Sequence, residues 1–89
     1  MELNFTIEVW QKGNWFIAKC PELDFISQGR TSDEAKKNLF EVIQIQFEEM
    51  DELGTLEEYL AECGFEKRND SFVPVSEMIG FERLCINLP

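Results

Sequence analysis

The chain has 89 residues, 44% hydrophobic and 12% aromatic, which is enough apolar surface for one folded domain over residues 1–89. Its 18 acidic and 8 basic residues give a formal net charge of -10, and it contains no histidine. A negative field repels phosphate backbones and anionic membranes, so neither direct nucleic-acid binding nor membrane binding is expected. Without histidine, Ser-His-Asp and Cys-His catalytic arrangements are excluded.

The cysteine pattern bears on compartment and metal chemistry. Cys20, Cys63 and Cys85 are far apart, so they form neither a disulfide framework nor a CxxC metal or redox motif. The first residues lack the basic and apolar regions of a secretory signal, and no apolar run approaches the roughly 20 residues that span a bilayer. We expect a cytoplasmic protein with free thiols, no bound metal and no cofactor.

Apolar and polar residues alternate from Leu3 to Trp10, which is typical of a half-buried strand. Lys12-Gly13-Asn14 has the composition of a turn, and Trp15 to Cys20 returns as a second strand, which predicts a hairpin. Pro21 ends that strand because proline cannot donate to a ladder, and Phe25 to Gln28 is predicted as the third strand. The expected helix-facing side of the first two strands comprises Leu3, Phe5, Ile7, Val9, Phe16, Ala18 and Cys20.

The third strand is followed directly by a helix signal. Gly29 can adopt positive φ, which suits the exit of the strand. Thr31 and Glu34 have the spacing of a capping box, in which each side chain satisfies a free backbone donor of the new helix. The sequence therefore predicts a strand, a tight turn and a capped helix.

A long amphipathic helix is predicted from about Ser32 to Leu53 and a short one from Leu56 to Cys63. Gly54 and Gly64 suit their C-terminal ends, and Thr55 with Glu58 repeats the capping-box spacing. The apolar residues of the long helix recur at helical spacing, widened by Phe40: Ala35, Leu39, Val42, Ile43, Phe47, Met50 and Leu53.

The pattern weakens after Gly64. Residues 65–67 suit a short strand and residues 68–71 a turn, and renewed alternation predicts a last strand from Glu82 to Leu88. We therefore expect an α+β fold in which an antiparallel sheet, in β-β-β-α-α-β order, carries both helices on one face. A last strand at a sheet edge can extend the sheet into a second copy, so a homodimer or tetramer is expected.

Two surfaces are candidates for partner binding. Trp10, Trp15 and Ile17 are predicted to point away from the helices, and exposed aromatic residues are enriched at interfaces. The alternative is a cross-strand tryptophan pair that only stabilises the hairpin turn. On the long helix, Ile45 falls outside the apolar arc and is a second candidate.

The long helix also belongs to an acidic run. From Glu41 to Glu62 there are eight acids, Glu48 and Glu52 among them, and no basic residue. A basic protein partner is the natural complement of this run, and a solvated helix face is the alternative.

A catalytic role has little support in the sequence. Adjacent acids such as Glu48 and Glu49 point in different directions on a helix, which disfavours a general acid pair. A two-metal site needs several converging acids, and Glu8, Glu22 and Asp24 are the only ones near the predicted strands. We do not expect an enzyme.

Several of these segments resemble the HicB-like antitoxin family, whose small α+β domains are similar to a partial, catalytically empty ribonuclease H fold. The most specific match is Ser27-Gln28-Gly29-Arg30-Thr31 with Glu34-Ala35 and Asn38-Leu39. The other matching segments are Gly13-Asn14-Trp15, Cys20-Pro21-Glu22-Leu23, Leu56-Glu57-Glu58-Tyr59-Leu60 and Gly64-Phe65. Together they cover about two-thirds of the chain. The chain departs from the family pattern at Asp24-Phe25, where many members carry a Pro-Gly turn, and no DNA-binding segment follows the predicted final strand.

The resemblance implies a non-enzymatic protein that neutralises a small basic RNA-cleaving toxin of the HicA type by protein-protein contact. The alternative is an oligomeric scaffold or small-ligand-binding protein that has no toxin partner. A neighbouring reading frame for a small, lysine-rich protein with a histidine would favour the antitoxin hypothesis.

Overall fold

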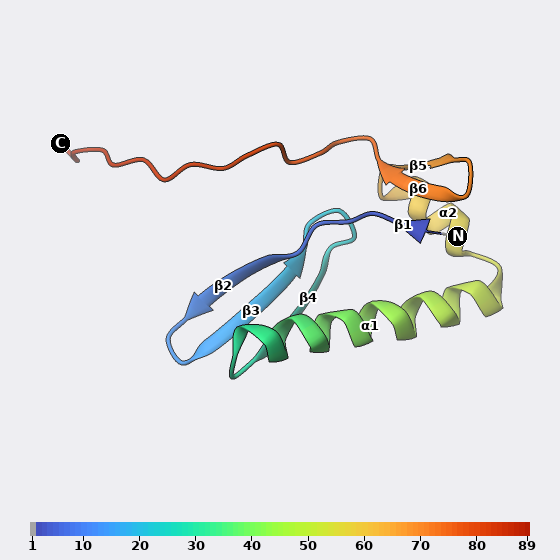
Figure 1. The fold of residues 1–89 in the computed structure, drawn as a ribbon, viewed down its shortest axis with the longest axis horizontal. Coiled ribbons are helices and arrows are strands. Elements are labelled where there is room, and N and C mark those ends of the chain that lie inside the picture. Colours follow the sequence, from blue (N-terminus) through green and yellow to red (C-terminus); the bar gives the residue numbers. More distant parts are fainter. Residues whose placement is uncertain (1) are drawn as a thin grey trace.

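The structure, a computed structural model, describes residues 2–89. Figure 1 shows a mixed architecture in which two helices accompany two three-stranded sheets. The elements in chain order are β1 (Glu2–Leu3), β2 (Glu8–Lys12), β3 (Trp15–Cys20), β4 (Phe25–Gly29), α1 (Ser32–Leu53), α2 (Leu56–Glu62), β5 (Phe65–Arg68) and β6 (Ser71–Pro74). The α+β class is confirmed, but the strands form two sheets instead of one.

The larger sheet is the antiparallel meander β2-β3-β4, called the meander sheet below. The predicted hairpin is present: a tight turn with Gly13 at φ 61° brings Lys12 opposite Trp15. Opposing residues in a sheet share a face, so Val9, Ala18 and Ser27 lie on one side. Ala18 is fully buried, which identifies that side as the one facing α1.

Helix α1 has the predicted bounds and lies over β3 and β4. Its buried residues Ala35, Leu39 and Ile43 follow helical spacing and meet the inner residues of the sheet. The core of the protein is this helix-on-sheet layer together with Leu23, Leu60, Phe65 and Phe72.

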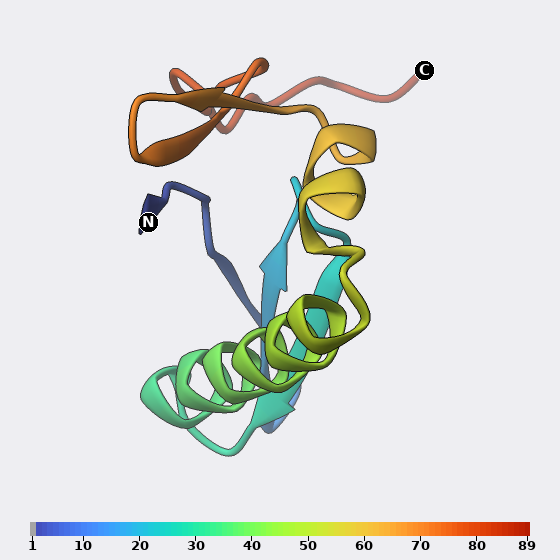
Figure 2. The same ribbon diagram turned by 90° about the vertical axis from the view of Figure 1, so that its right-hand side faces the viewer.

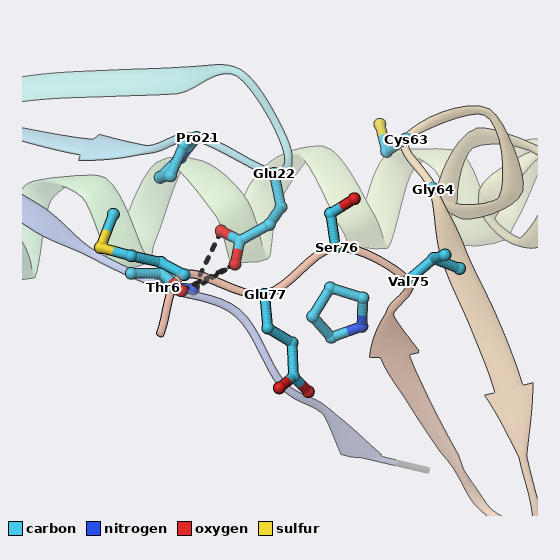
Figure 3. A pocket seen from close by; sticks show the side chains of 10 residues that line it. Thr6, Pro21, Glu22, Cys63, Gly64, Val75, Ser76 and Glu77 are labelled. Carbon is cyan, nitrogen blue, oxygen red and sulfur yellow. Dashed lines mark hydrogen bonds between the residues drawn. The ribbon is translucent and has the colours of Figure 1, made fainter. Parts of the chain in front are cut away.

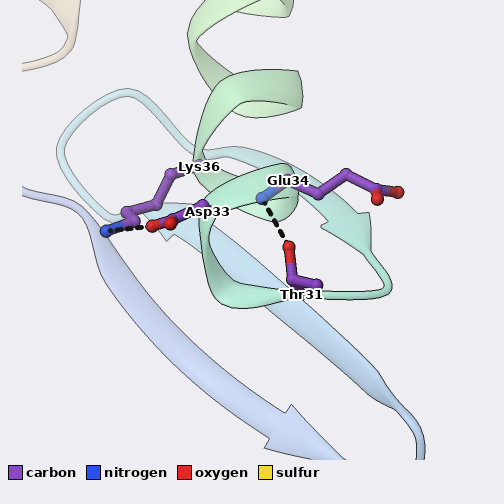
Figure 4. Close-up of polar contacts among 4 residues, drawn as sticks. All are labelled: Thr31, Asp33, Glu34 and Lys36. Atoms are coloured by element: carbon purple, nitrogen blue, oxygen red, sulfur yellow. Dashed lines mark hydrogen bonds and ion pairs between the residues drawn. The ribbon is translucent and has the colours of Figure 1, made fainter.

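The junction between β4 and α1 has the predicted Thr31 cap, but it differs from the prediction at Glu34, whose carboxylate bonds a backbone donor before the helix, and at Gly29. Figure 4 shows the Thr31 hydroxyl accepting the Glu34 N–H at 3.0 Å, and the Glu34 carboxylate accepts the N–H of Arg30. Gly29 does not have positive φ. It is required for space, because a Cβ there would lie 2.6 Å from the backbone nitrogen of Ala35.

The smaller sheet has the order β1-β6-β5, with β1 parallel and β5 antiparallel to β6. The α1 helix ends at Gly54, whose φ of 74° allows a Schellman motif: Gly54 N–H bonds the Asp51 carbonyl and Thr55 N–H bonds the Met50 carbonyl. The second predicted capping box is wrong. The Thr55 side chain makes no cap bond to α2, and its hydroxyl instead reaches back to the Met50 carbonyl.

The N-terminal strand prediction is also only partly confirmed. Instead of one strand from Leu3 to Trp10, β1 and β2 flank an irregular stretch in which Thr6 bonds to the Glu22 side chain. Leu3, Phe5 and Ile7 still pack against the core. Val9 faces α1 as expected but remains 39% exposed, because α1 lies over β3 and β4 and leaves the β2 edge uncovered.

The predicted strand from Glu82 to Leu88 does not form. Residues 75–89, called the C-terminal segment below, contain no helix or strand. The segment starts against the body, because the Val75 N–H bonds the Gly64 carbonyl and residues 75–78 line a cleft with Glu22. Its end extends away from the rest of the chain in both ribbon views (Figures 1 and 2). Its alternating pattern has no neighbouring strand to pair with inside the chain. Two residues of the predicted helical core are likewise exposed: Phe40, on the flank of α1, and Leu53, at its end.

Candidate protein-binding surfaces

The outer face of the meander sheet is the first candidate surface. Because Ala18 and Cys20 point inward to α1, the alternate residues Trp15 and Ile17 point outward, as predicted. Register places Trp10 opposite Ile17 and Ile26 opposite Lys19 on the same side. We call Trp10, Trp15, Ile17 and Ile26 the open face.

Cations border this open face. The Lys19 ammonium lies 5.8 Å from the ring centroid of Trp10, and the Arg30 guanidinium lies 4.3 Å from that of Trp15. Both distances suit cation–π contacts, which hold the indole rings against the sheet. The indole N–H of Trp10 also donates to the Glu8 carboxylate at 3.1 Å.

The two tryptophans are cross-strand neighbours, as the alternative interpretation requires, but they are diagonal and not directly opposed. Trp10 opposes Ile17, and Trp15 opposes Lys12, so the two indoles are diagonal neighbours. Each ring has a cation of its own, and Trp10 is 57% exposed. The tryptophans therefore present their outer surfaces to solvent, as an interface would require.

The second candidate surface lies on α1. Glu41, Ile45, Glu48 and Glu52 are spaced by four, three and four residues, so they form one row along the helix. All four side chains are exposed, Ile45 to 61%. We call this row the acidic stripe; it surrounds one large apolar residue with carboxylates.

The structure separates the two predicted groups. Trp10, Trp15 and Ile17 lie on the side of the meander sheet away from α1, whereas Ile45, Glu48 and Glu52 lie on the side of α1 away from the sheet's buried residues. They are two distinct candidate interfaces.

A third feature is a cleft of about 650 Å³ at the junction of the two sheets, between the β3–β4 turn and the start of the C-terminal segment (Figure 3). Glu22 is its most engaged polar group. Its carboxylate accepts the Thr6 N–H at 3.0 and 3.1 Å and the Thr6 hydroxyl at 2.7 Å. The Glu77 side chain points away from Glu22 in the figure.

The role of Glu22 is therefore structural, because its carboxylate oxygens hold the irregular stretch around Thr6 against the β3–β4 turn. The Tyr59 hydroxyl makes a second structural hydrogen bond by donating to the Leu23 carbonyl at 2.8 Å. These bonds tie α2 and the N-terminal stretch to the same turn.

Two buried or half-buried groups titrate abnormally beside the cleft. Burial raises the pKa of the Cys20 thiol from its ordinary value of 9.0 to about 11, with the neighbouring Glu22 charge adding to the effect. Burial likewise raises the pKa of Tyr59 to about 12, and Cys63 contributes. Both groups are held in the protonated form at neutral pH, which is the opposite of what an activated nucleophile needs.

Within residues 2–89 no three His, Cys, Asp or Glu side chains are placed to share a metal ion. Glu8, Glu22 and Asp24, the acids closest to the predicted strands, do not form such a group. No helix in this part of the chain is both long and apolar enough to cross a bilayer.

Sequence reasoning missed three members of the open face and its border. Ile26 alternates with the buried side of β4, and that period-2 position could have revealed it. Lys19 alternates in the same way with Ala18 and Cys20, whereas Arg30 had no such signal. The contacts of both cations with the indoles depend on strand register and on the position of the turn after β4.

Comparison with known proteins adds no relative: no family model, no curated protein and no solved structure matches this chain.

Proposed function

We propose that this chain is a non-enzymatic, HicB-like antitoxin module that binds and neutralises a small basic RNA-cleaving toxin of the HicA type in the cytoplasm. The proposal rests on the family resemblance of the strand-turn-helix segment around Gly29 and on the two exposed surfaces. Neutralisation needs no catalytic group on the antitoxin. It needs only a surface that covers the toxin's RNA-binding side.

The observation that carries the proposal is the acidic stripe. Its carboxylates belong to a run without any Lys or Arg between Glu41 and Glu62, so no basic residue within that run offsets their negative field. Ile45 supplies an apolar contact at the centre of that row. A basic partner would be attracted over a distance by the charges and then held by contact with the isoleucine.

The open face is a poorer match to a basic toxin, because Lys19 and Arg30 border it. We assign it to apolar contact instead, with the exposed indole of Trp10 as its largest element. In this scheme the toxin binds the acidic stripe, and the open face remains available to another subunit.

The test is co-expression with a small, lysine-rich, histidine-containing protein encoded next to this chain. We expect a stable complex whose association rate falls as salt rises, because screening removes the attraction between opposite charges. The double variant Glu48→Lys/Glu52→Lys should slow association by about tenfold or more. Stopped-flow measurements at several salt concentrations give the rates.

A matched control is Glu58→Lys/Glu62→Lys, which reverses two exposed charges on α2, outside the acidic stripe. It should change the association rate much less than Glu48→Lys/Glu52→Lys. Ile45→Ala should act mainly on dissociation. If no complex forms at any salt concentration, the antitoxin proposal is wrong.

The second candidate is an oligomeric scaffold or small-ligand-binding protein without a toxin. The exposed apolar side chains of the C-terminal segment favour the scaffold form of this alternative, because they suit contact with another subunit. A chain that assembles into a homodimer or tetramer but recovers no basic partner from its native extract would support it.

A further inference from the structure

The C-terminal segment exposes more apolar surface than a separate chain normally leaves in water. Beyond Met78 its large apolar side chains are almost fully exposed, from 83% for Ile86 to 97% for Ile79, and the others are Phe81, Leu84 and Leu88. The radius of gyration is 15.6 Å, against about 12 Å expected for a compact chain of this length. Such a segment is typical of an element that packs against another molecule.

The backbone of this segment is equally unpartnered. Residues 78–88 form no ladder, so their N–H and C=O groups are free to pair with the edge of a sheet. Their alternating sequence is suited to strand geometry, and eleven residues extend over about 36 Å. The segment therefore has the composition, length and free backbone of a strand that lacks its neighbour.

The β2 edge of the meander sheet has apolar side chains that no strand covers. Val9 on the inner side of β2 is 39% exposed, and Phe40 on α1 is 48% exposed. Asn38 and Phe40 point to opposite flanks of the helix, and Asn38 donates to the Gln28 carbonyl of β4. Phe40 therefore lies on the β2 side, where one more strand would cover both it and Val9.

The other edge of this sheet is less available. The bond from Asn38 to the Gln28 carbonyl uses an acceptor of β4, and α1 covers that strand. By contrast, β2 pairs only with β3 among residues 2–89. The β2 edge is thus the position at which the meander sheet can accept a fourth strand.

We propose that residues 78–88 of a second copy of this chain add to the β2 edge, and that the exchange is reciprocal. One side of each donated strand would then cover Val9 and Phe40, and the other would extend the open face beside Trp10. Because each copy donates and accepts the same elements, the contact closes as a two-fold dimer. This dimer goes beyond the proposed toxin binding and does not depend on it.

Strand direction favours a second copy over the chain's own segment. Figure 1 shows the C-terminal segment running in the same sense as β2, so docking on its own sheet would add a parallel strand to an antiparallel meander. A copy related by a two-fold axis can present the segment antiparallel, which matches the existing ladders. Donor and acceptor residues together approach the roughly 20 to 30 residues per side of a standard interface.

The experiment attaches a nitroxide spin label to Cys85, which lies exposed within the segment, in a Cys63→Ser background because Cys63 is a second accessible free thiol. Nitroxide-labelled protein without isotope label is mixed with isotope-labelled Cys85→Ser protein. Only the Cys85→Ser chains give amide signals, so any broadening by the nitroxide comes from a different copy. We expect strong paramagnetic broadening of the β2 amides, residues 8–12, relative to those of α2. A second sample contains a small fraction of chains that carry both the nitroxide and the isotope label, among unlabelled chains. Broadening in this sample reports docking of the segment within one copy.

Two variants with the same added charge test the contact. Ile86→Glu places a carboxylate at an apolar position and should weaken dimerisation at least about tenfold in sedimentation equilibrium, because burying a charge is costly. Asn87→Glu adds the charge at a polar position on the other side of the strand and should change it less than about threefold. Phe40→Ser should weaken the dimer from the accepting side.

Three results would overturn the proposal. The protein sediments as a monomer at all accessible concentrations; or the broadening falls on residues away from β2; or the broadening of β2 occurs only within a single copy. None of these results bears on the toxin, whose binding is measured separately at the acidic stripe.

Discussion

The β4–α1 unit and the C-terminal segment both carry apolar residues in a periodic pattern, yet only the first is packed. At the junction, Leu39 is fully buried, and a Cβ at Gly29 would collide with the helix backbone. In the segment, Leu84 is 86% exposed, and a Cβ at Gly80 would meet no atom within 4 Å. A periodic pattern thus indicates which secondary structure a segment can form, whereas a packing neighbour within reach decides whether that structure forms.

The largest effect should come from replacing leucine in the two regions. Leu39→Ala removes side-chain atoms from the centre of the helix-on-sheet core and should lower the free energy of unfolding by about 2 to 5 kcal/mol. Leu84→Ala in dilute, monomeric protein should change it by less than about 0.5 kcal/mol. Urea unfolding followed by circular dichroism measures both.

Equal losses in the two leucine variants would contradict this difference in packing, because they would mean that the C-terminal segment packs on the body of its own chain. A loss at Leu84 that appears only at high protein concentration would instead support it. That result would place the contribution of Leu84 in contact between copies.

The next largest loss of stability is expected where the backbone of Gly29 lies close to the start of α1. Gly29→Ala would place a methyl group 2.6 Å from the Ala35 nitrogen and 2.9 Å from two Glu34 carbons, so the start of α1 must shift. We expect a loss of about 1 to 3 kcal/mol. Gly80→Ala meets no atom within 4 Å and is the control, with an expected change below about 0.5 kcal/mol. Thermal unfolding of the two variants side by side would contradict this account if Gly29→Ala were as stable as Gly80→Ala.

Sequence reasoning was most successful where the determinants are local. The bounds of α1 follow from the Thr31 cap, the helical period and Gly54, all of which act within a few residues. The hairpin follows from a turn that joins adjacent strands. The split into two sheets could not be predicted in this way, because it depends on Glu22 holding Thr6 across 16 positions of sequence and on β1 pairing with β6.

The candidate surfaces also divide into features that local sequence determines and features that tertiary packing determines. Strand alternation was sufficient to place Trp10, Trp15 and Ile17 on the outer side of the sheet, and helical spacing placed Ile45 outside the core. The exposure of Val9 and Phe40 was missed because it depends on which strands α1 covers. That is a property of tertiary packing, which no local pattern records.

A smaller effect separates the buried and exposed cysteines at alkaline pH. The pKa of Cys20 is raised from 9.0 to about 11, so above pH 9 the native state holds its proton more tightly than the unfolded state does. The free energy of unfolding should therefore fall as pH rises from 9 to 11, by at most about 2 kcal/mol from this group. Unfolding in urea across this pH range measures the slope.

The matched variants for this slope are Cys20→Ala and Cys85→Ala. The first should flatten it, although its stability at neutral pH falls with the lost packing, and the second should leave it unchanged because Cys85 is exposed. Tyr59, whose pKa is raised to about 12, contributes in the same direction only above its ordinary value of 10.0. An unaltered slope in Cys20→Ala would show that another group causes the alkaline loss.

The smallest expected change in stability tests whether the β4–α1 junction depends on the Thr31 N-cap. Thr31 and Thr55 have the same sequence signature, but only the Thr31 hydroxyl accepts a helix N–H, at 3.0 Å from Glu34. Thr31→Ala should cost about 1 kcal/mol, whereas Thr55→Ala loses only a 3.4 Å bond to the Met50 carbonyl and should cost a few tenths. Amide hydrogen exchange adds a local readout: faster exchange in the first turn of α1 is expected for Thr31→Ala alone. If both alanine variants lost equal stability, the cap would not explain the helix start, and the close approach of Gly29 to Ala35 would remain as its determinant.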